Sequence, residues 1–219
     1  MLIQYDFQPR TIPPIVGVKP AVDVFHEWAM IGKDEGMEKG HAPAVSEMLK
    51  LAIPKVDTNF SAIDIGCGNG WVVRKLKSMG AKIAQGVDGA PEMIKKAKSI
   101  DNSGEYFYGL LPEWKPSRKF DLVHSMEFLY YLNEPLKMLK EIHDNWLEDR
   151  GWLVAGVDHY FENTESLSWP EHVGVHMTTL TIDQWGKGMN DAGFNNIEIL
   201  QVAGNNDFPG TLVMIGQVS

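Results

Sequence analysis

Glycines that follow a short apolar segment are the residues of this sequence best suited to hold a small ligand. The segment spans residues 60–65 and contains Asp64, and it is followed by Gly66, Gly68 and Gly70. Glycine has no Cβ, so its backbone can adopt positive φ angles and leave space for a ligand beside the main chain. A helical pattern begins directly afterwards, and a helix N-terminus adds free N–H groups and a positive dipole end. The pattern predicts a buried strand and a tight turn that hold a nucleotide-type ligand.

Asp88 is a second acid placed to contact such a ligand. It follows the apolar segment 82–87 and precedes Gly89. In a doubly wound sheet, an acid at the tip of the second strand accepts hydrogen bonds from the hydroxyl pair of a ribose. The alternative is that Asp88 only begins a turn before a helix at Pro91, since Asp and Gly are common turn residues. Its position one strand after the glycine turn favours the ribose role.

The elements that must position these residues alternate between strand and helix. The predicted strands are 60–65, 82–87, 104–108, 119–125 and 150–157. The predicted helices between them are 70–79, 91–100 and 134–147. After an irregular insertion, the last third adds a helix at 181–192 and two strands at 194–203 and 209–217. This order is typical of an α/β domain with a doubly wound, mostly parallel sheet of seven strands that ends in an antiparallel C-terminal strand.

The first forty residues follow a different pattern. Pro9, Pro13, Pro14 and Pro20 exclude a regular helix over residues 1–20 and predict an extended arm. A short helix at 21–31, a polar connector at 32–40 and a second helix at 43–51 follow. We therefore divide the chain into an N-terminal arm and lid helix at 1–40 and a main domain at 41–219.

Two further segments, Phe120–Leu132 and Gly151–Val157, complete a set of motifs with the glycine turn and Asp88. The set resembles the class I S-adenosylmethionine (SAM)-dependent methyltransferases from about residue 41 to the C-terminus. Its G-x-G-x-G spacing differs from the G-x-G-x-x-G of dinucleotide-binding proteins, which disfavours an NAD-dependent dehydrogenase. The resemblance implies a Rossmann-like methyltransferase fold, SAM as the cofactor, and transfer of its methyl group to an acceptor that the motifs do not identify.

The resemblance also implies which residues surround the cofactor. Asp64 and the glycine turn should contact the methionine portion and Asp88 the ribose, while residues 107–111 fall where relatives line the adenine. Many relatives carry an acid in that last segment, and this chain has none there. For Cys67, a small side chain that fills a tight turn is favoured over a reactive thiol. The candidate cofactor-binding residues are Asp64, Gly66, Cys67, Gly68, Asp88, Gly89, Met93, Leu110, Leu111, Ser125 and Met126.

Three residues, His41, Tyr131 and His159, are the candidates for catalysis at the acceptor. His41 precedes a helix in the region that often forms a lid in the family, where it is either a proton acceptor or a solvent-exposed residue. Ser125, Met126 and Glu127 follow the fourth strand and should lie at the floor of the site. Tyr131 comes shortly after them. His159 begins the insertion at 158–178, whose aromatic and histidine residues should shape the acceptor pocket.

The insertion also contains His172 and His176, four residues apart. This spacing raises the alternative of a metal site on a helix. Pro170 and Gly174 oppose a stable helix at that place, so we predict no metal.

The formal net charge of −9 disfavours a nucleic-acid partner, which is bound through clustered Lys and Arg. A small soluble acceptor is therefore the preferred prediction. A nucleic-acid or protein methyltransferase and a SAM-binding module without transfer activity stay as alternatives. The single cysteine and the absence of a signal-peptide or membrane-spanning pattern predict a cytoplasmic protein without membrane contact. A homodimer formed through the proline-rich arm is left open.

Overall fold

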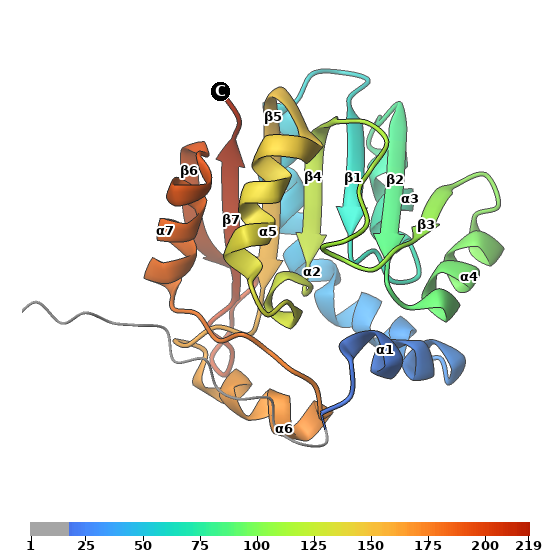
Figure 1. The fold of residues 1–219 in the computed structure, drawn as a ribbon, viewed down its shortest axis with the longest axis vertical. Coiled ribbons are helices and arrows are strands. Elements are labelled where there is room, and N and C mark those ends of the chain that lie inside the picture. The colour runs from blue at the N-terminus through green and yellow to red at the C-terminus, as the bar shows by residue number, and fades with distance from the viewer. Residues whose placement is uncertain (1–17) are drawn as a thin grey trace, which may run out of the picture.

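The computed structural model describes residues 18–219, and these form one seven-stranded sheet with helices on both faces (Figure 1). The strand order is β3-β2-β1-β4-β5-β7-β6, in which β1 to β5 run parallel and β7 runs antiparallel to both of its neighbours. The strands are β1 (Ser61–Ile65), β2 (Ile83–Asp88), β3 (Glu105–Tyr108), β4 (Phe120–Met126), β5 (Leu147–Val157), β6 (Asn195–Val202) and β7 (Thr211–Gln217). The predicted doubly wound fold is confirmed.

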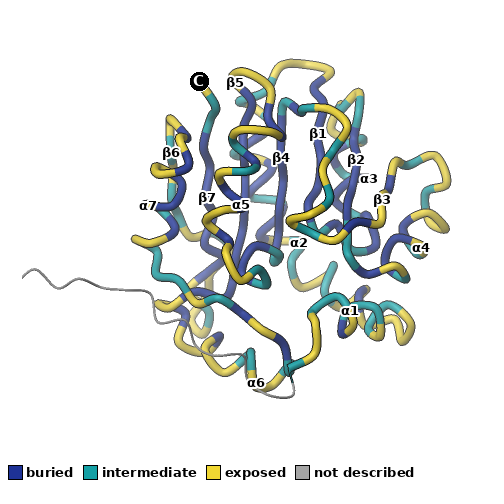
Figure 2. The backbone as a smooth tube through the Cα atoms, viewed as in Figure 1, coloured by how far each residue is buried: buried dark blue, intermediate teal, exposed yellow. Residues whose placement is uncertain are grey.

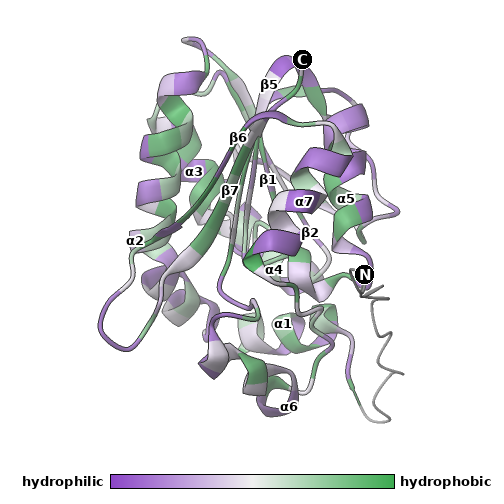
Figure 3. Cartoon of the chain, turned by 90° about the vertical axis from the view of Figure 1, so that its left-hand side faces the viewer, coloured by the Kyte–Doolittle hydropathy of each residue, from purple (hydrophilic) through white to green (hydrophobic). Residues whose placement is uncertain are grey.

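Each face of the sheet buries its own layer of apolar side chains. Helices α2, α3 and α4 cover one face, where Met48 and Leu76 are fully buried. Helices α5 and α7 cover the other face, where Leu139 and Trp185 are fully buried. Figure 3 shows the two layers from the side, and Figure 2 shows the buried strands between them. These helices are α2 (Asp34–Ala52), α3 (Trp71–Ser78), α4 (Pro91–Ile100), α5 (Pro135–Glu141) and α7 (Ile182–Ala192).

The parallel strands point their carboxyl ends toward a group of segments that we call the roof. The roof consists of residues 18–31, which include α1 (Ala21–Met30), residues 34–41 of α2, and residues 174–177 of the insertion. It lies beyond the strand ends in the lower part of Figure 1. Lys19 pairs with Val175 in a short parallel bridge, and the Lys19 N–H donates to the carbonyl of Gly174 at 3.0 Å. The segment before α1 is thereby joined to the insertion.

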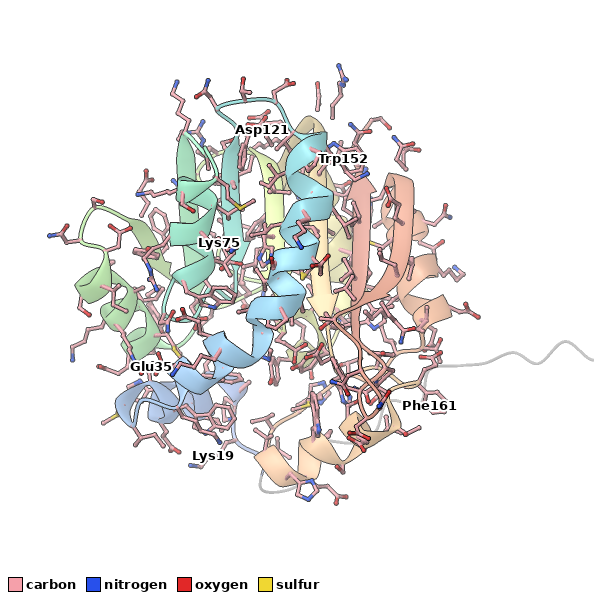
Figure 4. The ribbon with its side chains drawn as sticks, turned by 180° about the vertical axis from the view of Figure 1, so that it is seen from behind. Lys19, Glu35, Lys75, Asp121, Trp152 and Phe161 are labelled. Atoms are coloured by element: carbon pink, nitrogen blue, oxygen red, sulfur yellow. The ribbon has the colours of Figure 1, made fainter. Side chains whose placement is uncertain are left out.

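The prediction of a polar connector at 32–40 is wrong, because α2 runs without a break from Asp34 to Ala52. This helix contains two glycines and Pro43, all of which disfavour helix formation. Tertiary contacts hold its first turn in place. Asn69 donates to the buried Asp34 carboxylate at 2.9 Å, and the Lys96 ammonium also contacts that carboxylate at 2.9 Å. These bonds offset the low helix propensity, and the lid region becomes a continuation of the helix that packs on the sheet (Figure 4).

Most other boundaries lie within a few residues of their predictions. The helix predicted at 134–147 is α5 followed by one π-helical turn, and β5 begins at Leu147. The insertion is not wholly irregular, since it folds into two short helices. The predicted proline-rich arm spans residues 1–20, of which residues 1–17 lie outside the described part of the chain. The remaining short helices are η1 (Ile53–Lys55), η2 (Leu129–Tyr131), η3 (Ile142–Trp146), η4 (Thr164–Ser168) and α6 (Trp169–Val173).

Candidate functional site

A cavity of about 360 Å³ lies between the carboxyl ends of the parallel strands and the roof. Its floor includes residues that follow β1, β2 and β4, and its cover includes Phe25, Met37 and His41. The strand order reverses between β1 and β4, and the crevice beside such a reversal is where open α/β sheets bind their ligands. The fold therefore places the cavity where the sequence motifs require a ligand.

The glycine turn after β1 forms one wall of the cavity. Gly66, Gly68 and Gly70 all have positive φ angles, of 71°, 51° and 78°. A Cβ built on Gly68 meets only the Met93 sulfur, at 3.9 Å, so it would enter the open cavity. A Cβ on Gly66 would come within 2.7 Å of the Phe128 side chain. The turn thus needs glycine for its conformation, and at Gly68 it also exposes bare backbone to a ligand.

Asp88 connects the end of β2 to this turn. Its Oδ2 accepts a hydrogen bond from the Gly68 N–H at 2.9 Å, and its Oδ1 accepts one from the Ala90 N–H at 2.7 Å. Because a carboxylate offers about four lone pairs, both oxygens keep acceptor capacity toward the cavity. Burial raises the pKa of Asp88 to about 6, although the two backbone N–H groups act in the opposite direction. Asp88 can hold the turn and accept from a pair of ligand hydroxyls at once.

Asp64 is fixed by a neighbour in the sheet. It is the register partner of His124 on β4, and His124 Nδ1 lies 2.7 Å from Asp64 Oδ1. Both side chains are buried, and Asp64 also lines the cavity. In the described part of the chain, no donor is recorded for Asp64 Oδ2. That oxygen is available to a positively charged ligand group such as an ammonium.

The structure brings together nearly all of the residues predicted to bind the cofactor. Ser125 is the exception, because it is buried within β4 and does not line the cavity. Successive side chains of a strand point to opposite faces, so its neighbour Met126 reaches the cavity and Ser125 does not. The predicted residues that line the cavity are Asp64, Gly66, Cys67, Gly68, Asp88, Gly89, Met93, Leu110, Leu111 and Met126.

A second group of polar side chains lies at the ends of β4 and β5. His41, Glu127 and Asp158 each contribute one atom to a set whose members all lie within 4.8 Å of one another. Glu127 has a positive φ of 55°, and its side chain accepts from the Tyr130 hydroxyl and the Asp158 N–H. Asp158 accepts from the Thr211 hydroxyl at 2.6 Å. These contacts fix both carboxylates beside His41.

The packing of α2 explains how His41 reaches these acids. His41 precedes Met48 by seven residues, which is about two helical turns, so both lie on one face of α2. Met48 packs on Gly156 of β5, where a Cβ would come within 2.8 Å of the Met48 sulfur. Asp158 lies two residues beyond Gly156 and therefore on the same side of the strand. The close approach of α2 to Gly156 aligns His41 with Asp158.

Burial dominates the electrostatics of this group. It raises the pKa of Glu127 well above its usual range, and the neighbouring Asp158 carboxyl adds to the rise. It also raises the pKa of Asp158 and lowers the pKa of the His41 imidazole. All three shifts favour the uncharged forms, because each charge is costly in a desolvated position. A positively charged ligand placed among the three side chains would reverse this preference for the acids.

The other two catalytic candidates have different surroundings. Tyr131 lines the cavity, and its ring packs edge-on against Phe25 with centroids 5.2 Å apart. His159 is fully buried and does not line the cavity. Its Nδ1 lies 3.0 Å from the Ser166 carbonyl, and its Nε2 lies 2.8 Å from the Thr179 hydroxyl. Both ring nitrogens therefore bond inside the insertion, and His159 has no place in the site.

The histidine pair of the insertion is separated in space. Pro170 stands in the first turn of α6, which ends at Gly174, so the two histidines do not share a helix. His172 is exposed and bonds to the Ser168 carbonyl, whereas His176 lines the cavity. Within residues 18–219, the group close enough to hold a metal ion is His41, Glu127 and Asp158, which includes neither of them.

The residues that join the roof to the glycine turn left no signal in the sequence. Asn69 lines the cavity, and its amide donates to Asp34 at 2.9 Å and to Glu38 at 3.3 Å. No local sequence pattern predicts these contacts, because they depend on how α2 packs against the glycine turn. Asp158 was open to prediction, since polar residues that directly follow a parallel strand face the ligand crevice.

The family follows from comparison with known proteins. A family model described as a methyltransferase domain matches residues 37–199, which is most of the chain. The chain belongs to this family. Its described residues carry a methyltransferase domain with the α/β fold of SAM-dependent methyltransferases. The residues of the cavity fit SAM as a cofactor. Gly68 leaves open space beside the backbone, and the carboxylates of Asp64 and Asp88 can accept further hydrogen bonds.

Related proteins act on different acceptors. This methyltransferase is 27% identical over 151 residues to the tRNA U34 carboxymethyltransferase of Aeromonas salmonicida, a match that covers 63% of this chain and 45% of that protein. It is 26% identical over 129 residues to the trans-aconitate 2-methyltransferase of Agrobacterium fabrum, covering 58% of this chain and 48% of that protein. The chain thus spans about half the length of these curated relatives.

Solved structures confirm the fold of this methyltransferase. A chain in the complex between the Haloferax volcanii Trm112 methyltransferase activator and a putative methyltransferase matches with a TM-score of 0.78 and 27% identity, covering 89% of this chain and 97% of that chain. A SAM-dependent methyltransferase from Mesorhizobium loti matches with a TM-score of 0.66 and 21% identity, covering 81% and 97%. Within residues 18–219, no helix combines the length and apolarity needed to cross a membrane.

Proposed function

We propose that this methyltransferase transfers the methyl group of SAM to a small soluble acceptor. The roofed cavity and the mostly acidic side chains that line it support this proposal. Among the described residues that line it, Lys19 is the single Lys or Arg, whereas Asp34, Glu38, Asp64, Asp88 and Glu127 are acids. A polynucleotide would bring phosphates that need several cations. A volume of about 360 Å³ is also at the low end for ligand cavities, which favours a compact acceptor beside the cofactor.

The residues at the ends of β1 and β2 would hold the cofactor, which supplies an activated methyl group when bound. Asp88 would accept from the ribose hydroxyls, and Asp64 would face the ammonium of the methionine portion. The exposed backbone at Gly68 would let this portion lie close to the turn. Leu110 and Leu111 offer apolar surface for the adenine.

The roof supports the same function by covering one side of the cavity. Phe25, Met37 and Tyr131 line the cavity on the acceptor side, and the Lys19–Gly174 hydrogen bond joins the two parts of the roof. A dry site that holds both reactants in register lowers the entropic barrier of a displacement reaction. The chain would thus act mainly by positioning.

Modification of tRNA is the second candidate, favoured by the similarity to tRNA U34 carboxymethyltransferases. The two functions can be separated by one experiment with methyl-labelled SAM. Purified protein is incubated in parallel with a small-metabolite pool and with total tRNA, and the products are identified by mass spectrometry. We expect label in a small molecule and none in tRNA. Label in tRNA alone would replace our proposal by the second candidate. SAM binding without any transfer would support a non-catalytic module.

A further inference from the structure

We propose that the acceptor is a small primary or secondary amine, bound as an ammonium ion by His41, Glu127 and Asp158. The inference rests on the proposed function, since it names the chemical class of the small acceptor. It goes beyond that function by assigning these three residues a ligand.

The number and kind of polar groups suit an ammonium. One atom each from His41, Glu127 and Asp158 lie within 4.8 Å of one another; His41 and Glu127 line the cavity, and the buried Asp158 lies behind them. A carboxylate and the unprotonated nitrogen of an imidazole are hydrogen-bond acceptors, whereas an ammonium carries up to three donors and no acceptor. A hydroxyl has a single donor and would leave acceptors unmatched. His41 and Glu127 can therefore accept from an ammonium nitrogen at the cavity wall, and an ammonium that enters between them meets Asp158 as a third acceptor.

The charge of the cluster leads to the same ligand. The half-buried Glu127 and the buried Asp158 carry neighbouring carboxyl groups, and the Asp158 carboxyl contributes to the raised pKa of Glu127. Among the described residues, no Lys or Arg side chain is recorded as a partner of Glu127 or Asp158. A buried carboxyl group stays protonated and uncharged unless a cation lies beside it. An acceptor that brings a positive charge supplies the missing partner, and an acidic acceptor would meet repulsion.

Aromatic rings beside the cluster would hold the rest of the amine. Phe25 and Tyr131 pack edge-on at 5.2 Å and both line the cavity, together with Phe128. Such rings cover the carbon skeleton of an amine, and their faces attract a cation within about 6 Å. The combination of acids and aromatic rings is a common arrangement for binding an organic cation.

The cluster also provides the proton transfer that amine methylation requires. One proton moves from the ammonium to a ring nitrogen of His41, which burial keeps in its neutral form. The freed lone pair on nitrogen forms the new N–CH₃ bond while the C–S bond of the sulfonium breaks. The sulfur leaves with the bonding electrons as a neutral thioether, and the product is a methylated ammonium. His41 then releases its proton to solvent.

The test compares amines with alcohols of the same shape. Tyramine, phenethylamine and N-methylphenethylamine are paired with tyrosol and 2-phenylethanol. Binding to protein loaded with S-adenosylhomocysteine is measured by calorimetry, and transfer from methyl-labelled SAM is measured by mass spectrometry. We expect amines to bind and accept label, with each paired alcohol weaker by about tenfold or more, because it lacks the charge.

Variants locate the binding site. Glu127→Gln and Asp158→Asn should each weaken amine binding by about tenfold, while S-adenosylhomocysteine binding and the melting temperature stay close to wild type. Glu165→Gln is the matched control, since Glu165 is exposed on η4 and loses the same charge outside the cavity. Equal amine affinity in Glu127→Gln, Asp158→Asn and the control would overturn the assignment.

His41→Gln separates binding from proton transfer. It should lower kcat with little change in amine affinity and should remove one ionisation from the pH profile of kcat. The titratable groups next to His41 are Glu127 and Asp158 at the strand ends, and Tyr131, His176 in the insertion and Glu38 on α2 line the same cavity. These groups are unchanged in His41→Gln, so the ionisations that they contribute to the pH profile of kcat should remain. An unchanged pH profile would remove His41 from the proton transfer.

The remaining outcomes also decide. Labelling of a small alcohol or acid but of no amine would overturn this inference and leave the proposed function intact. Labelling of tRNA alone would overturn both. Tight binding of Mn²⁺ or Zn²⁺ that Glu127→Gln abolishes and that activity requires would identify the cluster as a metal site and overturn the amine assignment. Failure of every amine in the panel to bind at millimolar concentration would do the same.

Discussion

The two ends of the cavity are built in different ways. The cofactor end is built around the glycine turn after β1, which the Asp88–Gly68 hydrogen bond joins to the tip of β2. The acceptor end is assembled from His41, Glu127, Asp158 and Thr211, which lie on four distant segments. The first depends on backbone conformation and the second on how α2 packs on the sheet. Damage to one end should therefore leave the other largely intact.

The largest separation is expected from Asp88→Ala. The variant should weaken SAM binding by about a hundredfold, or roughly 2.7 kcal/mol, because it removes a charged acceptor. Burial raises the pKa of Asp88, so its charge is costly to the fold, and the melting temperature should fall only slightly. Calorimetry and thermal melting measure the two effects. The control is Asp207→Ala, an exposed loop residue outside the cavity. Equal losses in binding and folding would argue against the ribose role.

Acidification should affect the cofactor end next. With the pKa of Asp88 near 6, SAM affinity should fall by about tenfold between pH 7 and pH 5, as the free carboxylate takes up a proton. For the unliganded protein the sign is opposite. Because the folded pKa exceeds the ordinary 3.8, this group stabilises the fold at low pH and loses that contribution as the pH rises through about 6. Calorimetric titrations across this range, with Asp88→Asn as control, measure the dependence. An equally steep slope in Asp88→Asn would assign it to other groups.

A substitution beneath α2 should damage the acceptor end alone. In Gly156→Ala the new methyl group would approach the Met48 and Met126 sulfurs at 2.8 and 2.9 Å, displacing α2 at a cost of about 1–2 kcal/mol. Acceptor KM should rise while S-adenosylhomocysteine binding stays within about twofold of wild type. Gly186→Ala is the control, since its nearest neighbour lies at 3.7 Å and Ala favours a helix by about 0.5–1 kcal/mol. Loss of cofactor binding in Gly156→Ala would show that the two ends are coupled.

The smallest effect is expected at Cys67. Burial raises the pKa of its thiol well above the ordinary value, so the reactive thiolate is scarce at neutral pH. Iodoacetamide should leave the native protein unmodified in intact-mass measurements, and Cys67→Ala should bind S-adenosylhomocysteine almost as wild type. Rapid alkylation that SAM prevents would instead indicate a functional thiol.

The difference between the two ends also explains what the sequence could reveal. The alternation of strands and helices, the glycine turn and the place of Asp88 after the second strand were predicted because buried strands and turn glycines leave local patterns. The continuous α2 was missed because its glycines and Pro43 predict a break, and only the bonds of Asp34 to Asn69 and Lys96 overcome it. His159 was predicted as a catalytic residue, but its neighbour Asp158 is the residue that joins the cluster. The two differ because adjacent side chains at a strand end point to opposite sides.

The bridge between Lys19 and Val175 makes the cover of the cavity a closed loop of chain rather than a free flap. Two segments that lie far apart in the sequence are tied together beside the cavity. Entry of the substrate and release of the product should therefore require the segments around Lys19 and Val175 to move together. Turnover speed should consequently respond to changes at this remote junction even though neither residue performs chemistry.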